Sequence, residues 1–242
     1  MNKIAGLSDL QRALEYPYDA PSDAYLIKDG FVLALPQNYD FAGRTAVLSV
    51  GSNRAPVQLN RKFGDQAELP VTPVTVHDCD VVHVANLAPY GAVPCTAFPS
   101  AGASVNLNIA WLTDSQLSIM HETESLGLAY NWVEWDLGCI EHKFESALPR
   151  LFGYAAITGA LSDAGLGPFG LPRIPAQNRQ FAARTQNQMQ QMIYQRFCAD
   201  KMSFEDWVTC LQTDNVLRNK VAATLQQDSL HPENPPWQPA RP

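Results

Sequence analysis

Residues 45–53 read Thr-Ala-Val-Leu-Ser-Val-Gly-Ser-Asn, and this stretch does most to decide the fold. The apolar and β-branched residues at 45–50 predict a buried strand. The strand runs into a Gly-Ser-Asn turn at 51–53, and Pro56 follows, a residue typical of the first turn of a helix. Backbone N–H groups at a helix start have no partner inside the helix, so such a turn can hold a carboxylate or polarise a carbonyl. Alone the turn is weak evidence, because ordinary strand-to-helix turns have the same composition.

A second informative stretch is 111–124, where a strand leads into a helix. Thr113 can cap this helix, and Gln116 completes a capping box. Glu124 falls at the C-terminal end, where the helix dipole disfavours a negative charge. A carboxylate in that position is suited to take up a proton as a general base. The competing interpretation is a solvated surface carboxylate, the usual environment of glutamate.

Together the two stretches resemble the γ-glutamylcyclotransferase-like family. Members carry a Tyr-Gly-Ser-Asn or Tyr-Gly-Ser-Leu loop after the first barrel strand. A valine-rich strand, a Leu-x-x-Leu-Asp-x-x-Glu helix and a tyrosine follow. The corresponding parts here are Gly51-Ser52-Asn53, the strand at 105–111, the helix residues 117–124, and Tyr130. The resemblance spans residues 45–136 and depends on the order and spacing of motifs that are not specific singly.

The resemblance implies an α+β fold, a small mixed β-barrel flanked by helices. It implies an amide-cleaving lyase or transferase of the glutathione-metabolism type, in which Glu124 takes a proton from the α-ammonium of a γ-glutamyl amide. The freed amine then attacks the γ-carbonyl of the same molecule, and 5-oxoproline and an amine are released. No metal or organic cofactor is required. The implied substrate-binding residues are Val50, Gly51, Ser52, Asn53 and Tyr130.

Arg54 extends the loop with a positive charge. Because the N–H groups of the turn also favour anions, we expect the loop amides and Arg54 to bind a carboxylate of the ligand. The alternative is an Arg54 that only solvates the helix surface.

Two departures from the family pattern leave other functions open. Val50 stands where the family usually has tyrosine, and His121 where its helix usually has aspartate. A second hypothesis is therefore a related enzyme acting on another small carboxylated amide or urea derivative, like the similar domain at the end of allophanate hydrolase. A third is a non-catalytic binding module that keeps the pocket, with Glu124 exposed or salt-bridged away from the loop.

The rest of the chain divides into extensions of this unit. Residues 1–44 form an N-terminal extension with a hairpin around Asp29-Gly30, a pair that favours tight turns. Residues 45–180 form the barrel, with separate strands at 92–98 and 105–111. Residues 181–227 form a C-terminal helical extension, and the proline-rich residues 228–242 a disordered tail.

Composition restricts the partners. With 24 acidic and 17 basic residues the net charge is −7, which argues against a non-specific nucleic-acid binder. No apolar run approaches the roughly 20 residues of a membrane span, and the first ten residues lack a signal-peptide core. Five cysteines, an odd number, form no disulfide framework. We expect a cytoplasmic protein with a small-molecule substrate and no membrane partner; the oligomeric state is not predicted.

One other cluster could bind a metal. His77, Cys79 and His83 alternate along a predicted strand and could present three zinc ligands on one face. Their spacing fits no standard site, and we therefore predict no metal.

Overall fold

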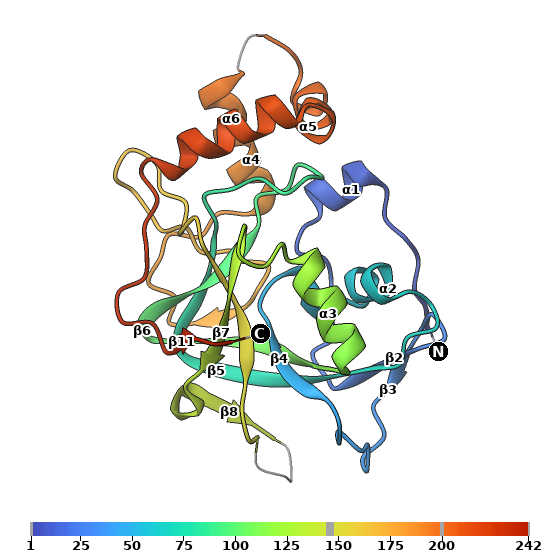
Figure 1. Cartoon of the computed structure of the whole chain (residues 1–242). Coiled ribbons are helices and arrows are strands. Elements are labelled where there is room, and N and C mark those ends of the chain that lie inside the picture. Colours follow the sequence, from blue (N-terminus) through green and yellow to red (C-terminus); the bar gives the residue numbers. More distant parts are fainter. Residues whose placement is uncertain (1, 144–147, 199–200, 242) are drawn as a thin grey trace.

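The structure, a computed structural model, describes residues 2–143, 148–198 and 201–241. These residues form an α+β fold with one mixed sheet and six α-helices (Figure 1). The helices are α1 (Asp9–Leu14), α2 (Pro56–Phe63), α3 (Asp114–Thr123), α4 (Gln186–Phe197), α5 (Phe204–Thr213) and α6 (Asn215–Gln226). The strands are β1 (Asn2–Lys3), β2 (Tyr25–Lys28), β3 (Phe31–Ala34), β4 (Thr45–Ser49), β5 (Leu69–His83), β6 (Cys95–Leu112), β7 (Tyr130–Trp135), β8 (Ile140–His142), β9 (Phe152–Ala156), β10 (Ala176–Gln177) and β11 (Trp237–Pro239).

The sheet is open, so the predicted barrel is not supported, whereas the α+β class is confirmed. Its strand order is β1-β3-β2-β5-β6-β4-β9-β7-β11, with β10 attached to β6 and β8 to β5. All pairs are antiparallel except β4 and β9, which makes the sheet mixed as predicted. The two edges are β1 and β11, near the two ends of the chain. Because these strands pair with β3 and β7 and not with each other, the sheet does not close.

The long strands β5 and β6 bend together in the middle. The register shifts between His77 and Cys79, and both Asp78 and Gly102 have positive φ. The Gly102 N–H donates to the Asp78 carboxylate at 2.8 Å, which ties the two bends together. The separate strands expected at 92–98 and 105–111 are therefore one strand, because the turn-forming residues between them make a bend and not a reversal.

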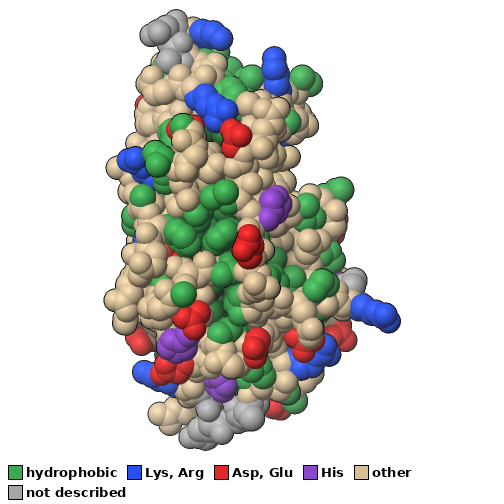
Figure 2. Space-filling model, turned by 90° about the vertical axis from the view of Figure 1, so that its left-hand side faces the viewer, with side chains coloured by type: hydrophobic (Ala, Val, Ile, Leu, Met, Phe, Trp, Pro, Cys, Tyr) green, Lys and Arg blue, Asp and Glu red, His purple; other side chains and the backbone are tan. Residues whose placement is uncertain are grey.

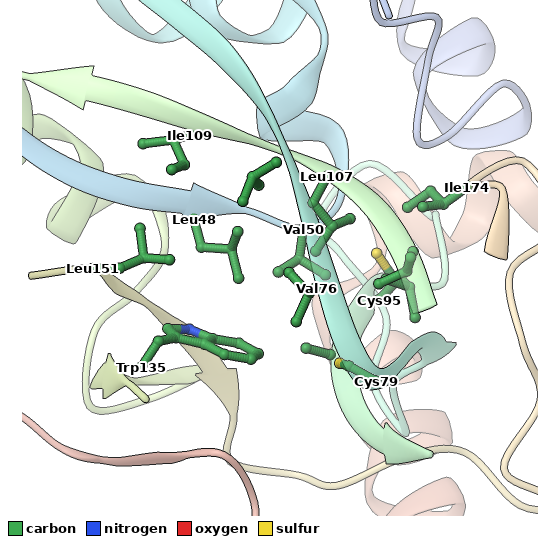
Figure 3. Packing of buried hydrophobic residues seen from close by; sticks show 14 of the residues in the cluster. Leu48, Val50, Val76, Cys79, Cys95, Leu107, Ile109, Trp135, Leu151 and Ile174 are labelled. Atoms are coloured by element: carbon green, nitrogen blue, oxygen red, sulfur yellow. The ribbon is translucent and has the colours of Figure 1, made fainter. Parts of the chain in front are cut away.

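The central strands bury side chains on both faces. Val47 of β4 packs with Leu59 of α2 and Met120 of α3 on one face, where the two helices lie side by side (Figure 1). Leu48 points to the other face, where it joins a core that includes Ile109 (Figure 3). This alternation is the period-two pattern of a strand covered on both sides. It fixes the register of β4 and hence the position of the turn that follows it.

The residues expected to form a helical extension contain α4, α5 and α6, which pack together beyond one end of the sheet (Figure 1). Ser203 and Asp214 cap the last two helices, as their positions in the sequence predict. Met189 and Ile193 belong to the core that these helices share with α1 and the segment 85–93. The apolar side of α4 that carries Met189 and Ile193 is therefore part of the core.

The proline-rich end differs from the disordered tail that its composition predicts. Its residues 237–239 form β11 along β7, and residue 242 lies outside the described part of the chain. The Trp237 and Trp135 rings lie 4.7 Å apart, so burial of aromatic surface fixes a segment that proline content alone would leave free.

Figure 2 shows one face of the molecule, with hydrophobic side chains gathered in a central band and Lys and Arg scattered around it. Within the described residues, no helix is both long and apolar enough to cross a membrane.

Candidate functional site

The structure brings the Gly-Ser-Asn turn and the end of α3 to one cavity. This cavity, of about 170 Å³, is called the Glu124 cavity below. Drug-sized ligands occupy pockets of about 300–1,000 Å³, so it suits a smaller molecule. Six of the seven residues proposed from the sequence line it: Val50, Gly51, Ser52, Asn53, Glu124 and Tyr130.

Glu124 is held at the C-cap of α3 by contacts with two other elements. Its Oε1 accepts a hydrogen bond from the side-chain Nδ2 of Asn53 at 3.1 Å and forms an ion pair with Lys62 of α2. The side chain of Lys62 is 1% exposed and that of Glu124 16%. Within the described part of the chain, Oε2 has no hydrogen-bond donor, although it is not buried away from the cavity. Oε2 is thus the atom available to a ligand.

The turn that ends β4 continues into a short 3₁₀ helix, Ser52–Arg54, preceded by Gly51 without a side-chain cap. The backbone at Gly51 packs closely against its neighbours. A methyl group there would lie 2.5 Å from the Tyr16 hydroxyl oxygen and 2.8 Å from Cys95 Sγ. Only glycine fits this approach without displacing neighbours, which explains the residue type at the cavity wall.

Four tyrosines surround the cavity: Tyr16, Tyr90, Tyr130 and Tyr154. Burial raises the pKa of Tyr16, Tyr90 and Tyr130 well above the ordinary value, and for Tyr90 and Tyr130 the nearby Glu124 charge adds to the effect. These phenols are therefore neutral. They can donate and accept hydrogen bonds but do not act as bases. Sequence reasoning missed three of them because their positions follow from folding and not from any local motif.

His121, the unusual residue of the α3 motif, contacts Tyr154. The Tyr154 hydroxyl and His121 Nδ1 are 2.8 Å apart, and the His121 ring packs edge-on against Trp132. Burial lowers the pKa of His121. The imidazole thus supports a tyrosine that lines the cavity.

Arg54 lies elsewhere. Its side chain is not part of the Glu124 cavity but lines a separate cavity of about 500 Å³. Its Nε donates to Asn108 Oδ1 at 2.8 Å. Arg54 and the turn residues 51–53, which we expected to bind one carboxylate together, therefore line different cavities.

Arg61 takes the place at the Glu124 cavity that we expected for Arg54. It belongs to α2, where residues 58, 61 and 62 are three and four apart and share one side of the helix. Burial lowers the pKa of Arg61, and its Nε donates to Gln58 at 3.2 Å. The helical spacing after Pro56 was the signal that could have identified Arg61 and Lys62.

The candidate zinc ligands do not meet. His77 is exposed and contacts Glu141 at 3.1 Å, whereas Cys79 and His83 are buried. His83 Nε2 instead contacts the Arg184 carbonyl at 2.8 Å. Among the residues that the structure describes, no group of His, Cys, Asp and Glu could hold a metal ion.

Comparisons with known proteins give only partial likenesses. No protein-family model matches the chain, and no curated protein matches it significantly. The solution structure of At5g39720.1 from Arabidopsis thaliana is 18% identical over 49% of this chain and 72% of that one, with a TM-score of 0.37. The solution structure of At3g28950.1 from the same plant is 16% identical over 51% of this chain and 67% of that one, with a TM-score of 0.35. The crystal structure of the uncharacterized protein loc79017 from Homo sapiens is 12% identical over 79% of this chain and 90% of that one, with a TM-score of 0.38.

Proposed function

We propose that the Glu124 cavity is the active site of an enzyme that cyclises γ-glutamyl amides to 5-oxoproline and an amine. The observation that carries the proposal is the hydrogen bond between Asn53 and Glu124. It joins the turn after β4 to the end of α3, the two features that a base and a substrate-binding loop require in one place. The α+β fold is compatible with the γ-glutamylcyclotransferase-like family that the sequence resembles.

The reaction needs a base and little else. Glu124 Oε2 accepts a proton from the α-ammonium of the substrate. The amine nitrogen attacks the γ-carbonyl carbon, a C–N bond closes the five-membered lactam, and the amide C–N bond breaks. The proton held by Glu124 passes to the leaving nitrogen, and the second proton of the attacking nitrogen follows through the same carboxylate. The amine therefore leaves as its ammonium ion, and the carboxylate is restored. Because both reacting groups belong to one molecule, the cavity has only to hold it in a folded conformation.

Other groups at the cavity have roles that follow from their chemistry. Lys62 and Asn53 fix the orientation of the Glu124 carboxylate. Arg61 offers a guanidinium for the α-carboxylate of the substrate. The neutral hydroxyl of a cavity tyrosine such as Tyr90 can donate to the oxygen that gains negative charge during attack.

A substrate screen tests the proposal. The purified full chain is incubated with a panel of γ-glutamyl amides, and 5-oxoproline is measured by mass spectrometry. We expect turnover of at least one member. In Glu124→Gln, turnover should fall by roughly 10²-fold or more, because the amide cannot accept the proton. Glu122→Gln, an exposed position on the same helix, is the matched control and should keep wild-type turnover.

Two results would contradict the proposal. If the folded protein forms no 5-oxoproline from any member of the panel, the proposed reaction is wrong. Wild-type turnover by Glu124→Gln would remove Glu124 as the base.

A second candidate function, a non-catalytic binding module, is favoured by the ion pair with Lys62. A buried ammonium already occupies one oxygen of Glu124, as expected where the carboxylate serves the fold. A module would bind γ-glutamyl compounds and release them unchanged. The same screen, extended to small carboxylated ureas of the allophanate type, separates these outcomes by whether the ligand is consumed and what it becomes.

A further inference from the structure

Arg54 lines a cavity with a volume of about 500 Å³. This cavity lies between β5, β6 and the loop at 18–24, and it shares no lining residue with the Glu124 cavity. Its size is within the range of sites that bind small ligands. The short helix Ser52–Arg54 therefore separates two cavities, with Asn53 lining one and Arg54 the other.

Arg54 has an incomplete set of partners there. A guanidinium carries five N–H donors, and within the part of the chain that the structure describes only Nε has a partner, Asn108. Nη1 and Nη2 make no hydrogen bond to any described residue, yet neither is sealed from solvent. Among the described residues no carboxylate lies within ion-pair distance of Arg54. A partly buried cation without a counter-charge is costly, and charges in such positions are normally paired.

None of the other charged residues described around the cavity compensates the positive charge of Arg54. Of the acidic lining residues, Asp19 is paired with Arg173 at 2.6 Å and Glu141 contacts His77, while Asp23 is exposed. Burial lowers the pKa of Arg54, which agrees with a guanidinium that has lost water without gaining an anion.

We propose that the cavity beside Arg54 is a second ligand site, separate from the Glu124 cavity, which binds an anionic group through Arg54 Nη1 and Nη2. Carboxylates and phosphates both have the paired oxygens that match the two parallel N–H directions of a guanidinium. Asn108 is 1% exposed and fixes the guanidinium through Nε, so the two terminal nitrogens are oriented before a ligand arrives. This proposal does not depend on the chemistry at Glu124.

The test is calorimetric titration of the full chain, at constant ionic strength, with inorganic phosphate and separately with succinate. We expect saturable binding of at least one probe, and the tighter one identifies the anion class. Arg54→Gln should weaken it by about tenfold or more, the scale of a charge-assisted hydrogen bond. Arg196→Gln, at a partly exposed ion pair on α4, is the control and should bind like the wild type.

Asn108→Asp provides a second variant if Arg54→Gln does not fold. It keeps the shape and the acceptor for Arg54 Nε but supplies an internal counter-charge, so we expect anion binding to fall by a similar factor while the fold is kept. The proposal is overturned if neither probe saturates the wild type. It is also overturned if a folded Arg54 or Asn108 variant binds as tightly as the wild type.

Discussion

The hydroxyl of Tyr16 lies against the backbone of Gly51, so close that a methyl group on Gly51 would come within 2.5 Å of the phenol oxygen. The same hydroxyl accepts the Cys95 N–H at 3.1 Å, which fixes it at the cavity wall. Tyr16 belongs to the N-terminal segment, outside the part of the chain that carries the family resemblance. It brings a phenol next to Val50, the position at which the resemblance leads one to expect tyrosine.

Gly51→Ala should therefore destabilise the fold. The new methyl group would displace Tyr16 or Cys95, and overpacking of this kind costs about 1–3 kcal/mol in the free energy of unfolding. Urea denaturation measures this change. Gly6→Ala is the matched control, because no heavy atom of the described residues would lie within 4 Å of a methyl group there.

A double-mutant cycle shows whether Tyr16 is the cause. Tyr16→Phe removes the nearest atom, so Gly51→Ala should cost less in that background than in the wild type. Equal costs in the two backgrounds, or a Gly51→Ala protein as stable as the wild type, would contradict the close contact.

The local elements could be predicted because their signals act over a few residues. Thr113 begins the capping box that its spacing from Gln116 predicts, and Asp29-Gly30 forms the tight turn of the β2–β3 hairpin. The shared cavity of Asn53 and Glu124 was also foreseeable, since the order of motifs in the chain indicated it.

Closure of the sheet could not be predicted in the same way, because it depends on which strands meet across long sequence separations. The direction of the Arg54 side chain could not be predicted for a different reason. In a 3₁₀ helix successive side chains point roughly 120° apart, so the residue after Asn53 faces away from the cavity that Asn53 lines. The helical spacing after Pro56 places Lys62 beside Arg61, but no motif in the sequence pairs it with Glu124. Tyr16 belongs to a segment without a motif, and packing brings its hydroxyl to Gly51.

Lys62→Met should destabilise the protein strongly. The substitution keeps the length of the side chain but leaves Glu124 with the Asn53 side chain as its one partner among the described residues. Removing one partner of a buried ion pair costs about 3–5 kcal/mol. Since Glu124 is partly exposed, we expect the lower end of that range in urea denaturation. Adding Glu124→Gln should recover part of the loss, because no unpaired charge then remains. Lys220→Met, at an exposed position on α6, is the control and should change the free energy of unfolding little. If Lys62→Met were as stable as Lys220→Met, the ion pair would not contribute to the fold.

Arg179→Ala should be more damaging than the equivalent change at the surface. Arg179 forms two hydrogen bonds of 2.8 Å with Asp80, which is 0% exposed, and a third with the Ile174 carbonyl at 2.9 Å. Without Arg179 a buried carboxylate is left unpaired, at a cost of about 3–5 kcal/mol. Arg150→Ala removes a bidentate pair of the same geometry with Glu134 at an exposed site and should lower the melting temperature far less. Equal shifts in melting temperature would show that burial is not what matters.

His83 should make the fold sensitive to mild acid. Burial lowers the pKa of His83 to about 4, from an ordinary value of about 6.5 in an unfolded chain. Between these values the unfolded chain binds a proton that the folded protein excludes, so stability falls as the pH drops through this window and is recovered above it. From about pH 7.5 to about pH 5 this one group should remove on the order of 2 kcal/mol from the free energy of unfolding. His83→Gln keeps a donor for the Arg184 carbonyl but cannot titrate, so its stability should fall by that much less over the same range. Urea denaturation at the two pH values measures the difference, with the exposed His231→Gln as control; parallel pH profiles for His83→Gln and the wild type would show that the buried imidazole does not govern the acid response.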